Sequence, residues 1–159
     1  MIAAPVTGLA ALGLMLLPTR REVSAPKFAE LPLGRLGAEA EDWLVRRRSL
    51  LPRTAATTID RIAARLHEIA PQLAPLNTSD ETAADARRLL SEHLPRLVDA
   101  YLAVPVGARV GEPEAQLKAG LKIVASELDR IAQALAADKV RDLAVEGRFL
   151  ESRYRRDAV

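Results

Sequence analysis

The stretch that decides the fold runs from Glu112 to Leu135 and reads EPEAQLKAGLKIVASELDRIAQAL. Its large apolar side chains recur in alternating steps of four and three residues, which is the heptad spacing of one helix face. Pro113 stands where the first turn of a helix tolerates a proline, and Glu112 and Glu114 suit the positive end of the helix dipole. The pattern predicts an amphipathic helix with an apolar stripe of Leu117, Leu121, Val124, Leu128, Ile131 and Leu135.

The length of this stripe separates two interpretations. It covers fewer than three heptads, whereas an intermolecular coiled coil usually needs about three or four. We therefore favour a stripe that is buried in the core of the chain's own bundle. An intermolecular coiled coil, and with it a homo-oligomer, is the alternative.

Two predicted helices lie in the first half of the chain. Residues 54–73 have a regular apolar face, and residues 38–51 form a shorter helix that Pro52 ends or kinks, because proline lacks a backbone donor. The apolar face of the longer helix comprises Ile59, Ile62, Leu66, Ile69 and Leu73, and that of the shorter one Ala40, Trp43, Leu44, Leu50 and Leu51.

A third helix is predicted over residues 79–103. The sequence of residues 78–81 has the form of a capping box, with Thr78 at the N-cap and Glu81 three residues later. Pro95 lies inside the helix and predicts a bend near Ser91, whose carbonyl loses its hydrogen-bond partner. Its apolar face comprises Ala86, Leu90, Leu94, Leu97 and Tyr101.

The last predicted helix covers residues 139–155, after a break at 136–138. Its apolar positions again step by three and four, at Val140, Leu143, Gly147, Leu150 and Tyr154. The predicted fold is therefore all-α: an antiparallel helical bundle of four to five helices, with a Pro-kinked third helix, over residues 38–155. Residues 156–159 form a tail.

Composition agrees with helices and excludes several classes of function. Hydrophobic residues make up 49% of the chain and aromatic residues 3%, which favours packing through small and aliphatic side chains. The chain has no cysteine, so disulfides, thiolate nucleophiles and cysteine-based metal sites are excluded. Its 23 basic and 21 acidic residues give a net charge of +2, and the only basic triple is Arg46, Arg47 and Arg48. This mixed charge argues against nucleic-acid binding, which needs a clustered basic surface.

The N-terminus carries a hydrophobic segment, residues 1–18. Residues 2–18 contain no charge and span about 26 Å as a helix, the lower edge of what crosses a bilayer. Arg20 and Arg21 follow and would hold the rest of the chain in the cytoplasm by the positive-inside rule. We therefore expect a membrane anchor, and residues 19–37, with their prolines and glycines, read as a linker. A buried core helix and a cleaved signal peptide without a basic start are the alternatives.

Few residues are candidates for chemistry. His67 and His93 each stand beside a glutamate, but neither has a partner at the spacing of a known metal site, so both are predicted to be surface or boundary residues. The chain has no phosphate-binding glycine loop, nucleophile elbow or dinucleotide fingerprint. We therefore predict no catalytic residue, no metal ligand and no cofactor.

The densest polar cluster lies at the end of the chain. Glu151 is spaced to pair with Arg148 and Arg155 on one helix, which is typical of a solvated face. The alternative is a docking face for a partner protein or for an anionic lipid headgroup. The candidate partner-binding residues are Arg148, Phe149, Glu151, Arg153, Tyr154 and Arg155.

The second half of the chain resembles a known family. The residues that carry the likeness are His93-Leu94-Pro95, Leu97-Val98-Asp99-Ala100-Tyr101-Leu102 and Val104-Pro105, followed by Arg148-Phe149-Leu150-Glu151-Ser152-Arg153-Tyr154. Residues 82–154 are similar in this way to the XpaC-like family, which is named for the hydrolysis of 5-bromo-4-chloroindolyl phosphate. The resemblance implies a helical bacterial protein at the inner membrane, linked to toxic-anion (tellurite) resistance proteins of the TelA type.

Two hypotheses for function follow. The first is a membrane-tethered helical adaptor without catalysis, which works through the C-terminal helix and the groove around the Pro95 bend. The second is a phosphoesterase, as the family name implies, although the sequence offers no nucleophile or metal cluster for it. A purely structural, oligomerising bundle is a third interpretation.

Overall fold

The computed structural model describes residues 27–77 and 79–155, so the hydrophobic segment 1–18 and the tail 156–159 lie outside the described residues. Within the described part the chain is helical and contains no strand, as the sequence predicts. Short 3-10 turns precede or connect the main helices, at Phe28–Glu30, Arg48–Leu50, Arg53–Ala55 and Val106–Ala108. The main helices are α1 (Leu33–Arg47), α2 (Ala56–Leu73), α3 (Glu81–Arg88), a π turn (Leu89–His93), α4 (Leu94–Ala103) and α5 (Glu112–Tyr154).

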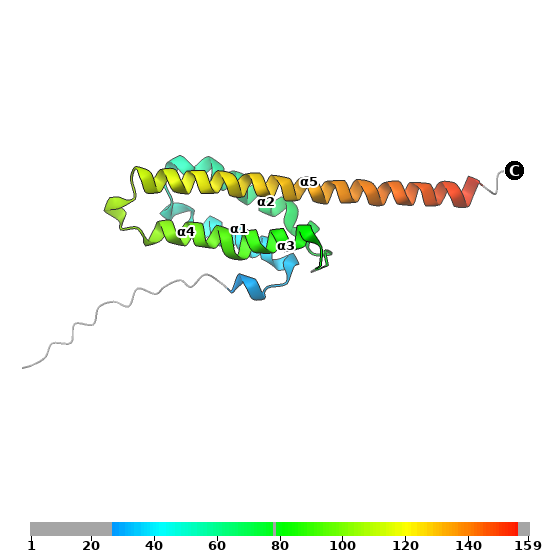
Figure 1. Ribbon diagram of the computed structural model, residues 1–159, viewed down its shortest axis with the longest axis horizontal. Helices are drawn as coiled ribbons and strands as arrows, with labels where there is room; N and C mark the ends of the chain where they lie inside the picture. The colour runs from blue at the N-terminus through cyan, green and yellow to red at the C-terminus, as the bar shows by residue number, and fades with distance from the viewer. Residues whose placement is uncertain (1–26, 78, 156–159) are drawn as a thin grey trace, which may run out of the picture.

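These helices form a four-membered bundle in which α3, the π turn and α4 make one continuous rod (Figure 1). Helices α1 and α2 run antiparallel and approach closely, because Gly34 and Gly37 lie against Ala74 and Ala70. The α3–α4 rod runs antiparallel to α5, since Gly120 of α5 contacts Leu97 of α4 at one end and Arg130 of α5 reaches α3 at the other. The antiparallel bundle predicted from the helical spacing is therefore confirmed.

The core consists of the stripes that the sequence marks as apolar. All five predicted residues of the α2 stripe are at most 1% exposed, and the six residues from Leu117 to Leu135 are at most 4% exposed. The latter stripe is buried inside the chain's own bundle, so the preferred interpretation of the heptad pattern is confirmed. At about 25 cal/mol for each Å² of apolar surface removed from water, such stripes are the main source of the bundle's stability.

The segment before α1 belongs to the bundle, which corrects the prediction of a linker for residues 27–37. Phe28 is buried edge-on against Trp43, with their ring centroids 5.9 Å apart. Arg87 of α3 donates hydrogen bonds to the carbonyl oxygens of Ala29 and Leu31. These are tertiary contacts. A segment fixed by such contacts needs no periodic apolar pattern, so its sequence does not reveal that it packs on the bundle. Helix α1 consequently begins at Leu33, five residues before the predicted start.

The end of α1 also differs from the prediction. The α-helix stops at Arg47, and a 3-10 turn leads to Pro52, which separates α1 from α2. Leu51 is buried as expected, but Leu50 is exposed and does not belong to the apolar face. The tighter 3-10 turn changes the angle between successive side chains, and this rotates Leu50 out of the core.

The bend predicted from Pro95 appears as a change in helix type. Over Leu89–His93 the hydrogen bonds run across five residues, and the Leu94 N–H donates to the carbonyl oxygen of Leu89. Such a π turn is a local widening of the helix that accommodates an interrupted ladder. Ser91 donates its side-chain hydrogen bond to the carbonyl oxygen of Arg87, 2.7 Å away. Four of the five predicted apolar residues on this rod are buried, and Leu97 is partly buried.

The predicted capping box is not the observed N-terminus of α3. Asp80 is the N-cap residue and Glu81 is the first helical residue, so Glu81 does not occupy the third position of the helix. The Asp80 carboxylate accepts a hydrogen bond from the backbone N–H of Asn77, 2.9 Å away, and thereby stabilises the preceding turn. Thr78 lies outside the described residues.

Helix α5 is continuous for 43 residues, which corrects the predicted break at 136–138. The sequence there, Ala136-Ala137-Asp138-Lys139, holds neither glycine nor proline, and alanine has the highest helix propensity. Two i,i+3 ion pairs also cross this point, Asp138 with Arg141 at 3.0 Å and Lys139 with Asp142 at 3.9 Å. Between residues 27 and 155, with residue 78 left aside, no helix has the length and apolar character needed to cross a bilayer.

Candidate functional site

The second half of α5 extends beyond the rest of the molecule (Figure 1). We call residues 112–135, which pack on the other helices, the bundle half, and residues 136–154 the projecting half. Every residue from Lys139 to Arg155 is exposed. At a rise of about 1.5 Å per residue the projecting half is about 28 Å long.

The projecting half stays helical without a core contact because its sequence and its attachment both favour helix. An isolated helix of this length is marginal in water, since the first turn is costly to form. Here the bundle half supplies the formed turns, so that each further residue adds a hydrogen bond at little cost. Arg148 adds a side-chain bond to the carbonyl oxygen of Ala144, 3.2 Å away.

An apolar stripe runs along the projecting half. We call it the distal stripe, and it comprises Val140, Leu143, Gly147, Leu150 and Tyr154. Val140 is 67% exposed, Leu143 73%, Leu150 46% and Tyr154 66%. No described atom of another part of the chain lies within 4 Å of the place where a Cβ on Gly147 would be. The stripe therefore presents four large apolar side chains and a gap at the glycine to solvent.

The distal stripe does not continue the buried stripe of the bundle half. At about 100° per residue, its residues lie about 100° further round the helix than the row from Leu117 to Leu135. This is the side of α5 that carries Asp129, which pairs with Arg61 and Arg65 of α2. The same side of α5 is thus covered by α2 in the bundle half and uncovered beyond it.

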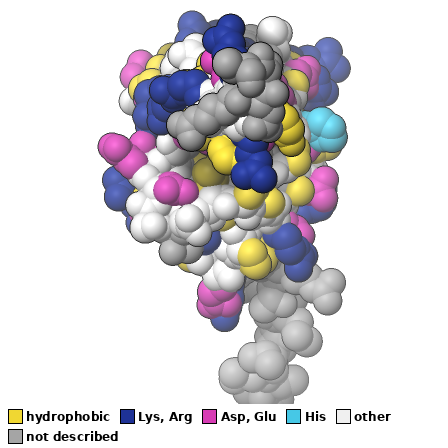
Figure 2. Space-filling view, turned by 90° about the vertical axis from the view of Figure 1, so that its right-hand side faces the viewer, with side chains coloured by type: hydrophobic (Ala, Val, Ile, Leu, Met, Phe, Trp, Pro, Cys, Tyr) yellow, Lys and Arg dark blue, Asp and Glu magenta, His cyan; other side chains and the backbone are white. Residues whose placement is uncertain are grey.

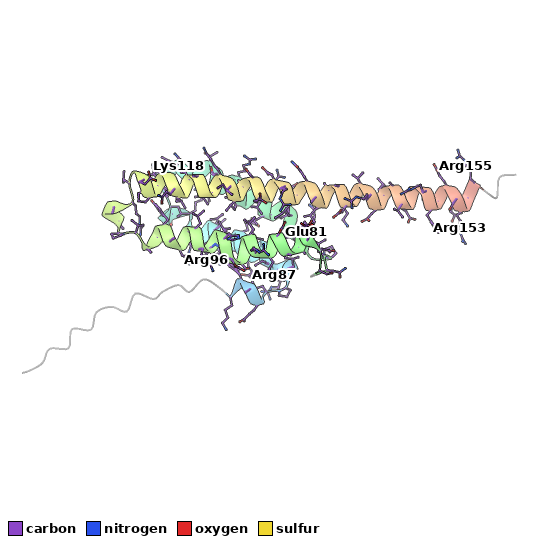
Figure 3. The ribbon with its side chains drawn as sticks, in the orientation of Figure 1. Glu81, Arg87, Arg96, Lys118, Arg153 and Arg155 are labelled. Atoms are coloured by element: carbon purple, nitrogen blue, oxygen red, sulfur yellow. The ribbon has the colours of Figure 1, made fainter. Side chains whose placement is uncertain are left out.

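The six predicted partner-binding residues all lie on the projecting half or at its end, and all are exposed. They do not converge on one point, because they are distributed around the helix. Arg148, Glu151 and Arg155 share one side, where together with Ser152 they line an open hollow of about 390 Å³. Tyr154 belongs to the distal stripe, and Phe149 and Arg153 lie on a third side by helical position. Figure 3 shows Arg153 and Arg155 directed away from the helix to different sides.

The ion pairs expected within this group are not formed. Among the described residues, no salt bridge joins Glu151 to Arg148 or to Arg155. Arg148 donates to a backbone carbonyl oxygen instead, and Ser152 does the same towards Phe149 at 2.8 Å. The charged side chains are consequently available to an external partner.

The spacing of the distal stripe predicts a packing face, whereas its large side chains are exposed. Val140, Leu143 and Leu150 have the spacing of a core helix, and this spacing does not say what covers the face. Seen from the end at which α5 projects, the molecule shows hydrophobic side chains among basic and acidic ones (Figure 2).

The surface around the π turn and Pro95 has two open hollows. Arg88, His93 and Arg130 line an open hollow of about 210 Å³ together with Asp85, Leu89, Glu127 and Ile131. Arg130 is held there by ion pairs to Asp85 at 2.6 Å and to Glu127 at 2.9 Å. A second hollow of about 330 Å³ lies on the other side of Arg88, against α1.

The histidines lie on the surface, as predicted. His67 is exposed and lies 3.3 Å from the carboxylate of Glu41, and His93 is also exposed. Within residues 27–77 and 79–155, no three histidine or carboxylate side chains come together as a metal site would require.

No family model matches this chain, and no curated protein and no solved structure is significantly similar to it. The geometry of the projecting half of α5 is therefore the main ground for a proposal about function.

Proposed function

We propose that this protein is a non-catalytic helical adaptor that offers the projecting half of α5 to a partner protein. One observation carries the proposal: 19 residues of regular helix extend from a bundle that has no need of them for its own core. Exposed apolar side chains in a contiguous row are costly for a soluble chain and mark contact surfaces. Helical segments that present an apolar face are also a common means of protein recognition.

The partner contact combines apolar and charged side chains. Phe149, which is 53% exposed, supplies apolar area, and Arg148 and Arg155 supply donors for a partner's carboxylates. Aromatic residues and arginine are the residue types that contribute most to protein interfaces. The proposed partner therefore contacts two sides of the helix, with apolar groups against Phe149 and carboxylates against the arginines.

The adaptor is tethered to the inner membrane in this proposal, with the bundle in the cytoplasm. The support is the uncharged run of residues 2–18 followed by Arg20 and Arg21, which is a sequence argument. The resemblance of residues 82–154 to the XpaC-like family supports a TelA-type partner and a role in toxic-anion resistance. An anchor would keep the projecting helix near partners at the same membrane.

The experiment is capture of partner proteins by the tagged full chain. We expect the charge reversal Arg148→Glu combined with Phe149→Glu to reduce partner recovery at least about tenfold, since a buried unpaired charge opposes binding. Ile123→Glu is the matched control, because Ile123 is 65% exposed on the bundle half of the same helix. Equal recovery with all three chains, or with a chain ending at Asp138, contradicts the proposal.

The phosphoesterase hypothesis is tested separately. Purified, metal-replete chain is incubated with an indolyl phosphate, and the adaptor proposal expects no turnover above a heat-treated control. Turnover that persists through further purification would contradict the non-catalytic proposal and support the phosphoesterase hypothesis.

A further inference from the structure

The charges beside the distal stripe restrict what can pair with it. In heptad terms Val140, Gly147 and Tyr154 occupy one core position, and Leu143 and Leu150 the other. Lys139, Glu146 and Arg153 flank the stripe on one side, and Ala144 and Glu151 flank it on the other. Such flanking charges select the partner and the orientation of paired helices.

Two arrangements of a second copy of this helix bring like charges together. In a parallel pair in register, Glu146 faces Glu151 of the other copy on both sides. In an antiparallel pair with Gly147 opposite Leu143, Glu146 faces its own counterpart and Lys139 faces Arg153. Like charges opposite each other in this way disfavour both arrangements.

A third arrangement places a helix where α2 already lies. If Gly147 were opposite Ala136 in an antiparallel pair, Tyr154 would lie opposite Asp129 of the other copy. That carboxylate is paired with Arg61 and Arg65 of α2 on the same side of α5. The bundle therefore blocks this arrangement.

A further antiparallel arrangement brings opposite charges together over residues 143–154. Gly147 lies opposite Leu150, so that the gap at the glycine receives the leucine of the other copy. Leu143 lies opposite Tyr154, and Glu146 faces Arg153. Because the arrangement is two-fold symmetric, each of these contacts occurs twice.

We propose that the distal stripe binds the distal stripe of a second copy of this chain, antiparallel, with Gly147 opposite Leu150. The inference rests on the proposed function, because it assigns one side of the same projecting helix. The overlap needs only residues 143–154, so that the two bundles lie at opposite ends of the pair without contact. The sides that carry Arg148, Phe149 and Arg155 stay available to the heterologous partner.

Cysteine pairing tests the arrangement, because the natural chain has no cysteine. Full-length chains carrying Gly147→Cys and Leu150→Cys, with different tags, are mixed and oxidised in detergent or in membranes. We expect a disulfide between the two variants in preference to either self-pairing, since only residues brought within about 7 Å can be bridged. Val145→Cys, on the opposite side of the helix, is the matched control and should yield little dimer.

Charge exchange tests the register in solution. We expect Glu146→Arg alone, or Arg153→Glu alone, to raise the dimer dissociation constant at least about tenfold in sedimentation measurements. The double variant should return it to within about threefold of the natural chain, because it restores opposite charges.

Three results would overturn the pairing. The first is self-pairing of each cysteine variant, which indicates a parallel dimer. The others are absence of rescue in the double charge variant and a monomeric mass at every concentration. The adaptor proposal fails independently, if partner recovery is unaffected by the Arg148 and Phe149 substitutions. A monomer that still captures its partner through Phe149 therefore refutes the second copy alone.

Discussion

The two halves of α5 have the same backbone geometry and contrasting surroundings. In the bundle half a row of large apolar side chains is almost fully buried, whereas in the projecting half the large side chains of a similarly spaced row are 46–73% exposed. The helix does not break between them. The comparison teaches that three-four spacing specifies a helix with an apolar face, while the covering of that face depends on how far the neighbouring helices reach.

The change of side between the rows has a physical consequence. If the distal stripe lay in line with the buried row, it would continue the face that packs against α2 and the α3–α4 rod. Instead it lies about 100° away, on the side that α2 covers up to about Asp129. The distal stripe of the projecting half thus offers packing surface for one additional helix rather than for several.

The largest expected difference between the halves concerns leucine truncation. Leu128→Ala should lower the free energy of unfolding by about 2–5 kcal/mol, because Leu128 is fully buried and leaves a cavity. Leu143→Ala should change it by no more than about 0.5 kcal/mol, because Leu143 is exposed. Urea denaturation at low protein concentration measures both. A loss at Leu143 comparable with that at Leu128 would mean that the distal stripe is covered within the chain.

The next difference concerns carboxylates. Asp129 in the bundle half accepts hydrogen bonds from Arg65, 2.9 Å away, and from Arg61, and the bond from Arg65 raises the pKa of that arginine. Asp129→Asn should cost about 1 kcal/mol of unfolding free energy, since solvent screens the partly exposed arginines. Asp142→Asn in the projecting half should cost nothing measurable, because its contact to Lys139 is at 3.9 Å on the surface. Equal effects in urea denaturation would contradict the comparison.

The sequence predicts the fold well where burial follows helix periodicity. Ile62 and Leu66 in α2, and Leu121 and Leu128 in α5, occupy the core positions that their spacing indicates. The disturbance of the helix before Pro95 is also predictable, because the missing N–H removes a defined hydrogen bond, and it takes the form of the π turn Leu89–His93. In these places a local rule and the tertiary structure demand the same conformation.

The errors lie where tertiary contacts decide. Phe28 and the residues around it are fixed by Trp43 and Arg87, which are distant in sequence. The break predicted at 136–138 is absent, because no residue there interrupts a helix. Similarly, the spacing of Leu143 and Leu150 predicts a packing face, whereas both side chains are exposed.

Replacing glycine by alanine should have a smaller effect on helix stability, and the effect should differ between the two halves. Alanine at position 147 should stabilise the projecting helix by about 0.5–1 kcal/mol, because alanine has the higher helix propensity and the added Cβ meets no neighbour. Alanine at position 120 should lose that gain, because its Cβ would lie 2.7 Å from both methyl groups of Leu97. Hydrogen exchange of the amides around each site measures the difference. Greater protection from Gly120→Ala than from Gly147→Ala would contradict the assignment of the two environments.

The smallest expected effect is a pH dependence of the stability of the bundle, which comes from an ion pair outside the projecting half. Asp60 of α2 accepts two hydrogen bonds from Arg48, at 2.7 and 2.8 Å, and this pairing lowers the pKa of Asp60 below its ordinary value of about 3.9. A carboxyl whose pKa is lower in the folded chain stabilises the fold above its unfolded pKa, and the stabilisation is lost as the pH falls through the folded pKa.

We therefore expect the urea midpoint of the natural chain to exceed that of Asp60→Asn by a constant amount above about pH 5, and the gap to narrow below about pH 4. Arg48→Gln removes the cause of the pKa change, so that Asp60→Asn made in that background should show little dependence on pH. A gap that persists undiminished at pH 3 would mean that Asp60 stabilises the bundle by packing rather than by charge. A gap that widens on acidification would reverse the sign of the linkage and contradict the ion pair as its origin.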